Sequence, residues 1–432
     1  MLKDTPKKLD RALNHLKNSG EQLVSLTAEL IRYSTENPPA ENYEVLLYIR
    51  DFLKRFGLDC ELHNPADGAW ALTSSHGDGD DGLIFYGHAD VVPAGDPSKW
   101  VHPPYSGRVV GGRIYGRGAS DMKAGLAAEL FAYTQLYQDE VELPGKVEFV
   151  CVLDEEDWHS TPVGWGMSDW LLTTGKLSGK ACVMGEPSGI HKICLGERSD
   201  YWVRLCVQGE PRHGSTAVYE DNACVKLFKT IENIHSALAQ LIAEPPQDIR
   251  GVVYDSPKHI AEDLGDAASN LTYEQLLEFL VKPTLNVGVL RGGTMINIVP
   301  PKCEAELAIC IPIGMSRERL HEVVSRVVEA QGDTTLELLD EAPVNPSYTK
   351  PHSRIARVTQ QEAAHTLGQP PQFYVTQATS DANIFRKHGV ETVFYGPGEF
   401  KEAHSYNESV DISATTHAAQ IYLKTAAHYF YT

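Results

Sequence analysis

Several histidines and carboxylates of the sequence directly follow short apolar stretches of the kind that form buried strands. In open α/β sheets ligands bind beyond the carboxyl ends of the strands, so polar side chains placed there are the first candidates for a functional site. Imidazole and carboxylate groups are also the usual ligands of zinc and related ions. The candidates are His88 and Asp90 in LIFYGHADVVP, Asp121 in GRGASDMKAG, Glu155 and Glu156 in VCVLDEED, Glu186 in ACVMGEPSG and His404 in YGPGEFKEAHSYNES.

Each candidate has a structural interpretation when it is taken singly. A histidine at a strand end is usually structural, Asp121 could cap the helix that follows it, and an acidic run is usually a solvated loop. The acidic run here, however, follows the strongly apolar stretch FVCVL. Successive residues of an extended chain face opposite ways, so Glu155 and Glu156 can divide the work of metal binding and proton transfer.

Taken together, the candidates contain enough ligands for two metal ions that share one carboxylate. Two such ions can hold a bridging hydroxide as nucleophile and polarise a substrate carbonyl. Glu155 then serves as the general base that receives the proton of the water, and Asp90 orients the ring of His88 from behind. The predicted ligands are His88, Asp121, Glu156, Glu186 and His404.

Competing catalytic motifs are incomplete. His321 and Glu322 begin like HExxH, but the second histidine of that zinc helix is missing. The stretch from Gly77 to Gly82 matches GxGxxG only as a string, because it precedes a strand and contains aspartates that would repel a pyrophosphate. The eight cysteines form no CxxC pair and several lie in apolar runs, which predicts buried thiols.

Composition limits the classes of partner. The apolar fraction of 42% and charged fraction of 22% are those of a globular protein, and no apolar run approaches the roughly 18 residues of a membrane span. A formal charge of −20 disfavours nucleic acid and anionic membrane surfaces. The first residues contain neither an apolar signal region nor a cleavage site, so we expect a cytoplasmic protein with a small-molecule substrate.

The elements that position the candidates follow a βα alternation, which predicts a mostly parallel sheet covered by helices on both faces. From about residue 193 the strands have alternating apolar and polar residues and are accompanied by long helices. From about residue 351 the βα alternation returns. A chain of 432 residues is long enough for two domains. We therefore expect a catalytic domain in two parts, residues 1–194 and 346–432, with an α+β unit inserted at residues 195–345.

The motifs GHADVVP, GRGASDMKAG, DEE, GEPSG and AHSYNESV, in that order, resemble those of a known enzyme family. This is the family of dinuclear zinc amidohydrolases typified by acetylornithine deacetylase, succinyl-diaminopimelate desuccinylase and the glutamate-releasing carboxypeptidases. The resemblance covers nearly the whole chain and implies a zinc-peptidase-like catalytic domain with an inserted lid and dimerisation domain. It also implies that Asp121 bridges the two ions, that Glu155 is the acid/base, and that Asp90 is the partner of His88.

The inserted unit carries two further resemblances. VQGEPRHGSTAVYEDNA is similar to the lid segment in which a histidine binds the oxyanion, often in the neighbouring subunit's site, which implies a catalytic role for His213 and a homodimer formed through the lid. GGTMINIVPP is similar to the substrate-facing turn of the lid, which implies Asn297 as a substrate-binding residue.

One position departs from the family pattern. Many relatives read DIRxPPG, with an arginine suited to a substrate carboxylate, whereas this chain reads AICIPIG and places Cys310 there. Arg198, Arg212 and Arg291 are candidates to replace that arginine.

The sequence thus predicts a metal-dependent hydrolase that cleaves the amide bond of an N-acyl amino acid or a short acylated amine. Two zinc ions are expected, although cobalt or manganese suits the same ligands. A dipeptidase or aminopeptidase of the same family is the nearest alternative. A non-catalytic binding protein with this fold is a remote one, because such a protein would be expected to have lost at least one ligand or the base.

Overall fold

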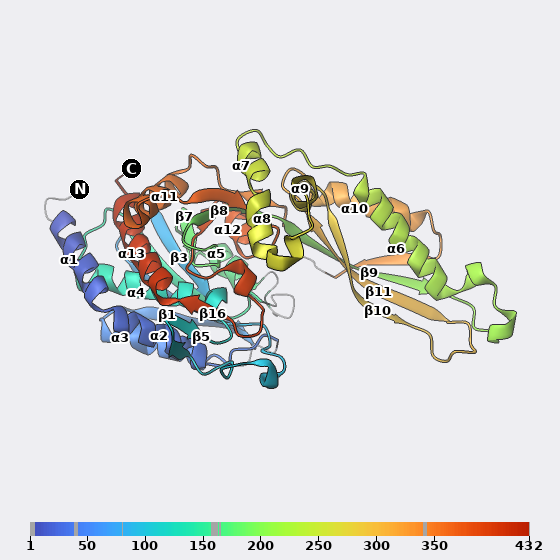
Figure 1. The fold of residues 1–432 in the computed structure, drawn as a ribbon, viewed down its shortest axis with the longest axis horizontal. Coiled ribbons are helices and arrows are strands. Elements are labelled where there is room, and N and C mark those ends of the chain that lie inside the picture. The colour runs from blue at the N-terminus through green and yellow to red at the C-terminus, as the bar shows by residue number, and fades with distance from the viewer. Residues whose placement is uncertain are drawn as a thin grey trace.

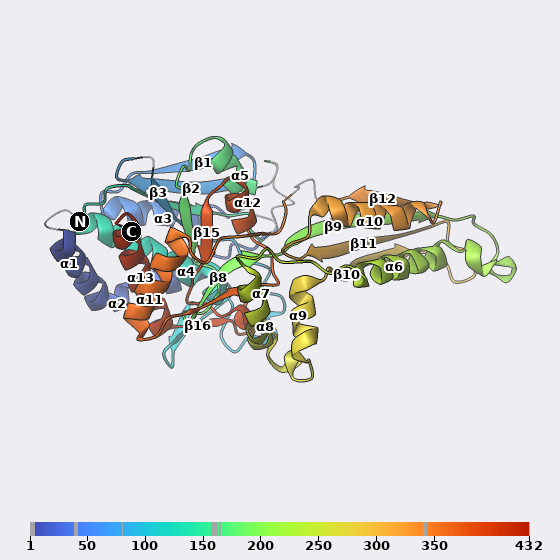
Figure 2. The same ribbon diagram turned by 90° about the horizontal axis from the view of Figure 1, so that it is seen from above.

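The computed structural model describes residues 5–38, 42–79, 81–156, 163, 166–339 and 344–431. Figure 1 shows a rounded body, which contains both ends of the chain, and an elongated arm that projects from one side. The arm contains strands β9 to β12 with helices α6 and α10, and the turned view in Figure 2 shows the same division. In the described part of the chain no helix has the length and apolar character needed to cross a membrane.

The body is built on a sheet of nine strands among the described residues. Its centre is parallel, in the order β6, β3, β7 and β15, and antiparallel strands join towards both edges. The strands are β1 (Cys60–Ala66), β2 (Ala69–His76), β6 (Lys146–Val152), β3 (Gly82–His88), β7 (Ala181–Met184), β15 (Glu391–Phe394), β8 (Lys192–Glu197), β13 (Ser347–Tyr348) and β14 (Gln372–Val375). The expected sheet is confirmed.

Strand β3 explains why the central strands read as continuous apolar runs. Leu83 and Phe85 belong to the core on one face of the sheet, and Ile84 and Tyr86 belong to the core on the other. A strand covered on both faces needs apolar side chains at every position.

Helices cover both faces of this sheet. One face packs against α1 (Thr5–Asn18), α2 (Gly20–Arg32), α3 (Glu44–Arg55), α4 (Ala124–Gln138), α11 (Arg354–Leu367) and α13 (Ile412–Tyr429), and the other against α5 (Gly166–Thr173) and α12 (Ala382–Lys387). Helix α4 contacts β3 on one side and α13 on another. It is buried along nearly its whole length and carries apolar residues all round, as a central helix must.

The start of α4 approaches β7 so closely that only glycine fits. A Cβ on Gly125 would lie 1.9 Å from the carbonyl oxygen of Gly185, and no flexible side chain is there to yield. Gly125→Ala is therefore expected to lower the free energy of unfolding by about 3 kcal/mol, at the upper end of the usual cost of overpacking. Chemical denaturation followed by circular dichroism measures this loss. Gly251→Ala is the matched control, because its Cβ meets nothing within 4 Å, and an equal loss in both variants would contradict the explanation.

The arm is an antiparallel sheet in the order β10, β11, β9 and β12, with two helices packed on it. Alternate residues of β9 and β11 are buried, which accounts for the alternation of apolar and polar side chains in their sequences. Its elements are β9 (Ser199–Gln208), α6 (Ala223–Ala239), β10 (Thr284–Gly292), β11 (Lys302–Ile311), α10 (Arg317–Glu329) and β12 (Thr334–Leu338). The expected α+β unit is present.

Three short helices between α6 and β10 pack on the body rather than on the arm. They are α7 (Arg250–Asp255), α8 (Pro257–Leu264) and α9 (Tyr273–Val281), and their buried residues Val253, Ile260 and Leu280 belong to the core of the body. Ser256 also donates its hydroxyl to Val252 and accepts the backbone N–H of Val375 in β14 at 2.9 Å.

Candidate active site

The predicted ligands meet at one edge of the body sheet. His88 is the last residue of β3, Glu156 follows β6, Glu186 follows β7 and His404 lies in the loop after β15. These four strands are consecutive in the sheet, so their carboxyl ends lie side by side. Asp121 joins them from the turn of residues Ala119–Lys123 that leads into α4.

The five side chains form two groups that share Asp121. In the first group the Nε2 of His88 lies 3.3 Å from Oδ1 of Asp121 and 3.7 Å from Oε1 of Glu186. In the second group the Nε2 of His404 lies 3.5 Å from Oδ2 of Asp121 and 3.1 Å from Oε2 of Glu156. The two carboxylate oxygens of Asp121 therefore face two different histidines.

These separations fit the ligand spheres of small divalent ions. Ligand atoms about 2.0 to 2.2 Å from a tetrahedral zinc ion lie roughly 3.3 to 3.6 Å from one another. Three buried atoms of the groups, Nε2 of His88 and Oε1 of Glu156 and Glu186, have no hydrogen-bond partner in the described structure. Buried polar atoms are almost always satisfied, so the residues present fit a pair of cations.

The tautomer of His88 also suits a metal ligand. Its Nδ1 lies 3.0 Å from the backbone carbonyl oxygen of Asp90, which can only accept, so Nδ1 carries the proton. The Nε2 atom then presents its lone pair to the first group. The Asp90 carboxylate lies 3.4 Å from the same Nδ1 and accepts the side-chain N–H of Asn37 and the backbone N–H of Glu156, each at 3.0 Å. Asp90 thus lies behind His88, as expected.

Glu155 lies beside the first group, with Oε2 3.9 Å from Nε2 of His88. Burial raises the pKa of its carboxyl well above the ordinary value, and the neighbouring Glu186 carboxylate raises it further. Burial and the Asp121 carboxylate likewise raise the pKa of Glu156. Hydrogen bonds to Asp121 and Glu156 raise the pKa of His404 to about 10. The crowded carboxylates therefore hold excess negative charge that a cation can neutralise.

A further buried carboxylate, Glu408, fixes the loop that carries Asp121. It accepts the backbone N–H groups of Ser120 at 2.8 Å and of Gly118 and Asp121 at 3.0 Å, and a 2.7 Å hydrogen bond from Arg117. The small sheet of β4 (Arg108–Val110), β5 (Arg113–Tyr115) and β16 (Ser409–Asp411) brings these segments together. Sequence reasoning missed Glu408, because a carboxylate next to a polar loop reads as solvated.

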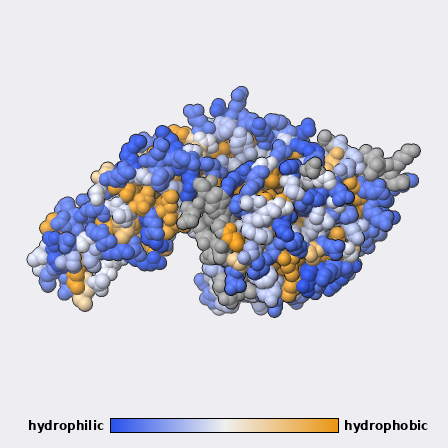
Figure 3. Space-filling model, turned by 180° about the vertical axis from the view of Figure 1, so that it is seen from behind, coloured by the Kyte–Doolittle hydropathy of each residue, from blue (hydrophilic) through white to orange (hydrophobic). Residues whose placement is uncertain are grey.

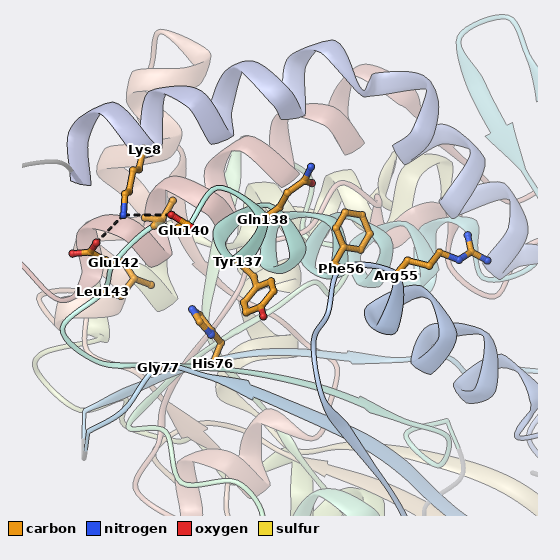
Figure 4. A pocket seen from close by; sticks show the side chains of 11 residues that line it. Lys8, Arg55, Phe56, His76, Gly77, Tyr137, Gln138, Glu140, Glu142 and Leu143 are labelled. Atoms are coloured by element: carbon orange, nitrogen blue, oxygen red, sulfur yellow. Dashed lines mark hydrogen bonds and ion pairs between the residues drawn. The ribbon is translucent and has the colours of Figure 1, made fainter.

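A cavity of about 150 Å³ adjoins the two groups. A larger cavity of about 890 Å³ lies at the side of the body, between the start of α1 and the ends of α3 and α4 (Figure 4). It contains the ion pairs of Lys8 with Glu142 at 2.7 Å and Glu140 at 4.0 Å, and the edge-on rings of His76 and Tyr137. None of the predicted site residues lines this larger cavity, so the size of a cavity does not identify the predicted catalytic site.

The structure does not bring His213 or Asn297 to the cluster within one chain. Both belong to loops between arm strands and lie next to each other, with a 2.7 Å hydrogen bond from Gly214 N–H to the Asn297 carbonyl. These loops follow β9 and β10 at the end of the arm remote from the body (Figure 1). His213 accepts the backbone N–H of Ser215 at its Nδ1 atom, at 3.2 Å.

None of the three arginines proposed to replace the lid arginine lies free at the cavity. Arg198 donates to the carbonyl oxygens of Phe279 at 2.7 Å and Cys310 at 2.9 Å. Arg291 lies 3.3 Å from Glu306 on the arm, and Arg212 lies 4.0 Å from Asp221. The Cys310 thiol lies 3.5 Å from Asp200 and does not line the cavity either.

Comparison with known proteins decides the family. The model of peptidase family M20/M25/M40 matches residues 84–428, which include every predicted site residue. The chain belongs to this family. It is thus an M20 family metal-dependent amidohydrolase, as the order of its motifs predicts.

Individual relatives of this M20 protein are distant. A succinyl-diaminopimelate desuccinylase of Wolbachia pipientis is 28% identical over 57% of this chain and 61% of that protein. An N-formyl-4-amino-5-aminomethyl-2-methylpyrimidine deformylase of Halalkalibacterium halodurans is 23% identical over 98% of this chain and 97% of that protein. The solved structure of an M20 family metallo-carboxypeptidase from Sulfolobus solfataricus shares the fold, with a TM-score of 0.80 and 22% identity over 95% and 99% of the two chains.

Proposed function

We propose that this protein hydrolyses the amide bond of an N-acyl amino acid or a short acylated amine with two divalent metal ions, zinc in the first place. The position of Asp121 carries the proposal. Its two oxygens face His88 and His404 at 3.3 and 3.5 Å, so one carboxylate belongs to two ligand groups at once. This arrangement is that of a dinuclear centre, in which the ions lie roughly 3.5 to 4 Å apart.

The proposed roles follow from the geometry. His88, Asp121 and Glu186 hold one ion, and Asp121, Glu156 and His404 hold the other. When bound there, the ions acidify a water molecule and polarise the carbonyl group of the substrate. Glu155 takes the proton of the water and passes it to the leaving amine, which its protonated form can do without an outside acid. The Asp90 carbonyl keeps the ring of His88 in the orientation that this arrangement needs.

A homodimer would complete the site. The loops that carry His213 and Asn297 follow β9 and β10 at the end of the arm that is remote from the body and its cluster (Figure 1). Strand β10 forms an edge of the arm sheet and exposes the apolar side chains of Val287 and Leu290. Helix α6 of the arm also exposes Phe228. Figure 3 shows apolar residues gathered on one face of the arm. We propose that residues 195–345 act as the lid and dimerisation unit, and that the arm of one protomer supplies His213 to its partner's site in a cytoplasmic enzyme.

Metal removal tests the proposed function directly. Activity is to be screened over N-acetyl, N-succinyl, N-carbamoyl and aromatic-acyl amino acids, with unacylated dipeptides as a second set. We expect hydrolysis of acylated substrates that disappears with a chelator and returns with added zinc. The chelated protein should also melt at a lower temperature, because an ion that binds only the folded state stabilises it.

Two outcomes of the screen would contradict the proposed deacylase function. Turnover that persists after exhaustive chelation would contradict metal-dependent hydrolysis. Cleavage of the dipeptides alone would favour the dipeptidase or aminopeptidase alternative, since a peptidase must recognise a free amine or carboxylate.

A further inference from the structure

The cavity beside the ligand groups has a wall that is mainly apolar. Apart from the carboxylates of the site, its aromatic and apolar lining comes from Tyr374, Phe394, Phe400, Pro187 and Ala378. Phe394 and Tyr374 are almost fully buried, at 6% and 2% exposure, so their rings are fixed parts of the wall. The ring of Tyr374 is held edge-on by His259 of α8. The helices inserted between α6 and β10 therefore support the shape of this cavity.

The polar groups of the wall already have partners inside the protein. Ser380 donates to Glu197 at 2.9 Å, and Thr379 donates to the carbonyl oxygen of Arg198 at 3.2 Å. Thr376 accepts the backbone N–H of Ala378 at 3.2 Å. Glu197 itself forms a fully buried ion pair with Arg386 at 3.3 Å. The hydroxyl protons of Ser380 and Thr379 are therefore engaged inside the protein, which lowers the capacity of the wall to solvate a negative charge.

No lysine or arginine is among the described residues that line the cavity. A carboxylate held against this apolar wall without enough hydrogen-bond donors loses most of its solvation free energy.

We propose, building on the function proposed above, that this cavity receives the acyl group of the substrate and selects a group that is uncharged and mainly apolar. A short branched or aromatic acyl group fits this description, whereas a succinyl group does not.

A pair of isosteric substrates tests this selection. N-succinyl and N-(4-methylpentanoyl) derivatives of one amino acid have the same heavy-atom skeleton and differ in a carboxylate against an isopropyl group. We expect kcat/KM of the zinc-loaded protein to be at least about 100-fold higher for the 4-methylpentanoyl compound, the size of discrimination that an unsolvated charge produces. Equal rates, or a preference for the succinyl compound, would overturn the inference while leaving metal-dependent deacylation intact. Cleavage of neither compound would overturn the proposed function and this inference with it.

A variant that places a positive charge in the cavity wall tests the same selection from the side of the protein. Phe400 lines the cavity and is partly exposed, so an arginine there can point into the cavity without breaking the core. Phe400→Arg is expected to shift the ratio of the two kcat/KM values at least about tenfold towards the succinyl compound, as a charge-assisted pair should. Phe400→Leu is the control and should keep the preference of the original protein. A ratio that is the same in all three proteins would mean that the acyl group does not occupy this cavity.

An independent observation concerns Glu408. Its buried carboxylate receives three backbone N–H groups of residues 118–121 and one bond from Arg117, so both of its oxygens are used. Asp121, the residue shared by the two ligand groups, lies at the end of this loop. We infer that Glu408 is a positioning residue: it sets the place of the Asp121 carboxylate and so the affinity of the site for both ions.

Glu408→Gln tests the positioning role. Glutamine has the same shape, but its amide nitrogen cannot accept the backbone N–H groups. Titration of the metal-free variant with zinc in a calorimeter is expected to show a dissociation constant raised about 10- to 100-fold, the usual effect of losing an outer partner of a ligand. Its kcat should fall at limiting zinc and recover at high zinc, with KM little changed.

The control for Glu408 is Glu402→Gln in the same loop. Glu402 pairs with Arg113 at 3.2 Å, is partly exposed and makes no bond to residues 118–121, so its loss should leave zinc affinity unchanged. A Glu408→Gln variant that melts earlier but binds zinc as tightly as the original protein would show that Glu408 only stabilises the fold, and would overturn the inference.

Discussion

Glu155→Gln is expected to lower kcat by about 10³- to 10⁴-fold, at the upper end of the usual contribution of a general acid or base. Glutamine keeps the size and polarity of the side chain but cannot accept the proton of the attacking water. Glu155 lies 3.9 Å from His88 yet belongs to neither ligand group, so the variant should bind zinc as the original protein does. The measurements are steady-state kinetics and elemental analysis of the same sample.

The control for this prediction is Glu61→Gln, which removes an exposed carboxylate that is paired with Lys176 and lies in the edge strand β1. It should leave kcat unchanged. Normal turnover by Glu155→Gln would refute the general-base role. A loss of zinc in parallel with activity would instead make Glu155 a ligand.

Asp121→Ala is expected to remove bound zinc from both groups and to lower kcat/KM by more than about 100-fold, since loss of even an outer partner of a ligand costs that much. The reason is that Asp121 contributes one oxygen to each group. His404→Ala should remove one ion only, because His404 contacts only the second group. Elemental analysis after dialysis measures the difference between the two variants. An Asp121→Ala protein that retains two ions per chain would show that this carboxylate is not shared.

The predicted ligands lie together in the structure because of one property of parallel sheets. His88, Glu156 and Glu186 each follow an apolar strand, and the carboxyl ends of neighbouring parallel strands meet at one edge. A polar residue after a buried strand can therefore be assigned to that edge without knowing the strand order. The shared role of Asp121 needed the family resemblance, because its position before a helix also suits a cap.

Other features depend on contacts that the sequence does not show. Helix α1 was missed although Leu9, Ala12, Leu13 and Leu16 recur at the spacing of one helix face, and Leu9, Ala12 and Leu16 are buried in the packed structure. Strand β1 contains Asn64 and Pro65, which favour turns, and it forms through pairing with β2 across an irregular register. Glu408 was missed because its three backbone donors come from a loop nearly 290 residues away in the chain. The proposed site of action of His213 lies in a second protomer, so no property of its own segment locates it.

The most direct test of the account is a crystal structure of the zinc-loaded protein with anomalous scattering measured at the zinc absorption edge. We predict two peaks per chain about 3.5 to 4 Å apart. One should lie among His88, Asp121 and Glu186, and the other among Asp121, Glu156 and His404. A fully active protein with a single peak, or with peaks away from Asp121, would contradict the dinuclear centre on which the proposed function depends.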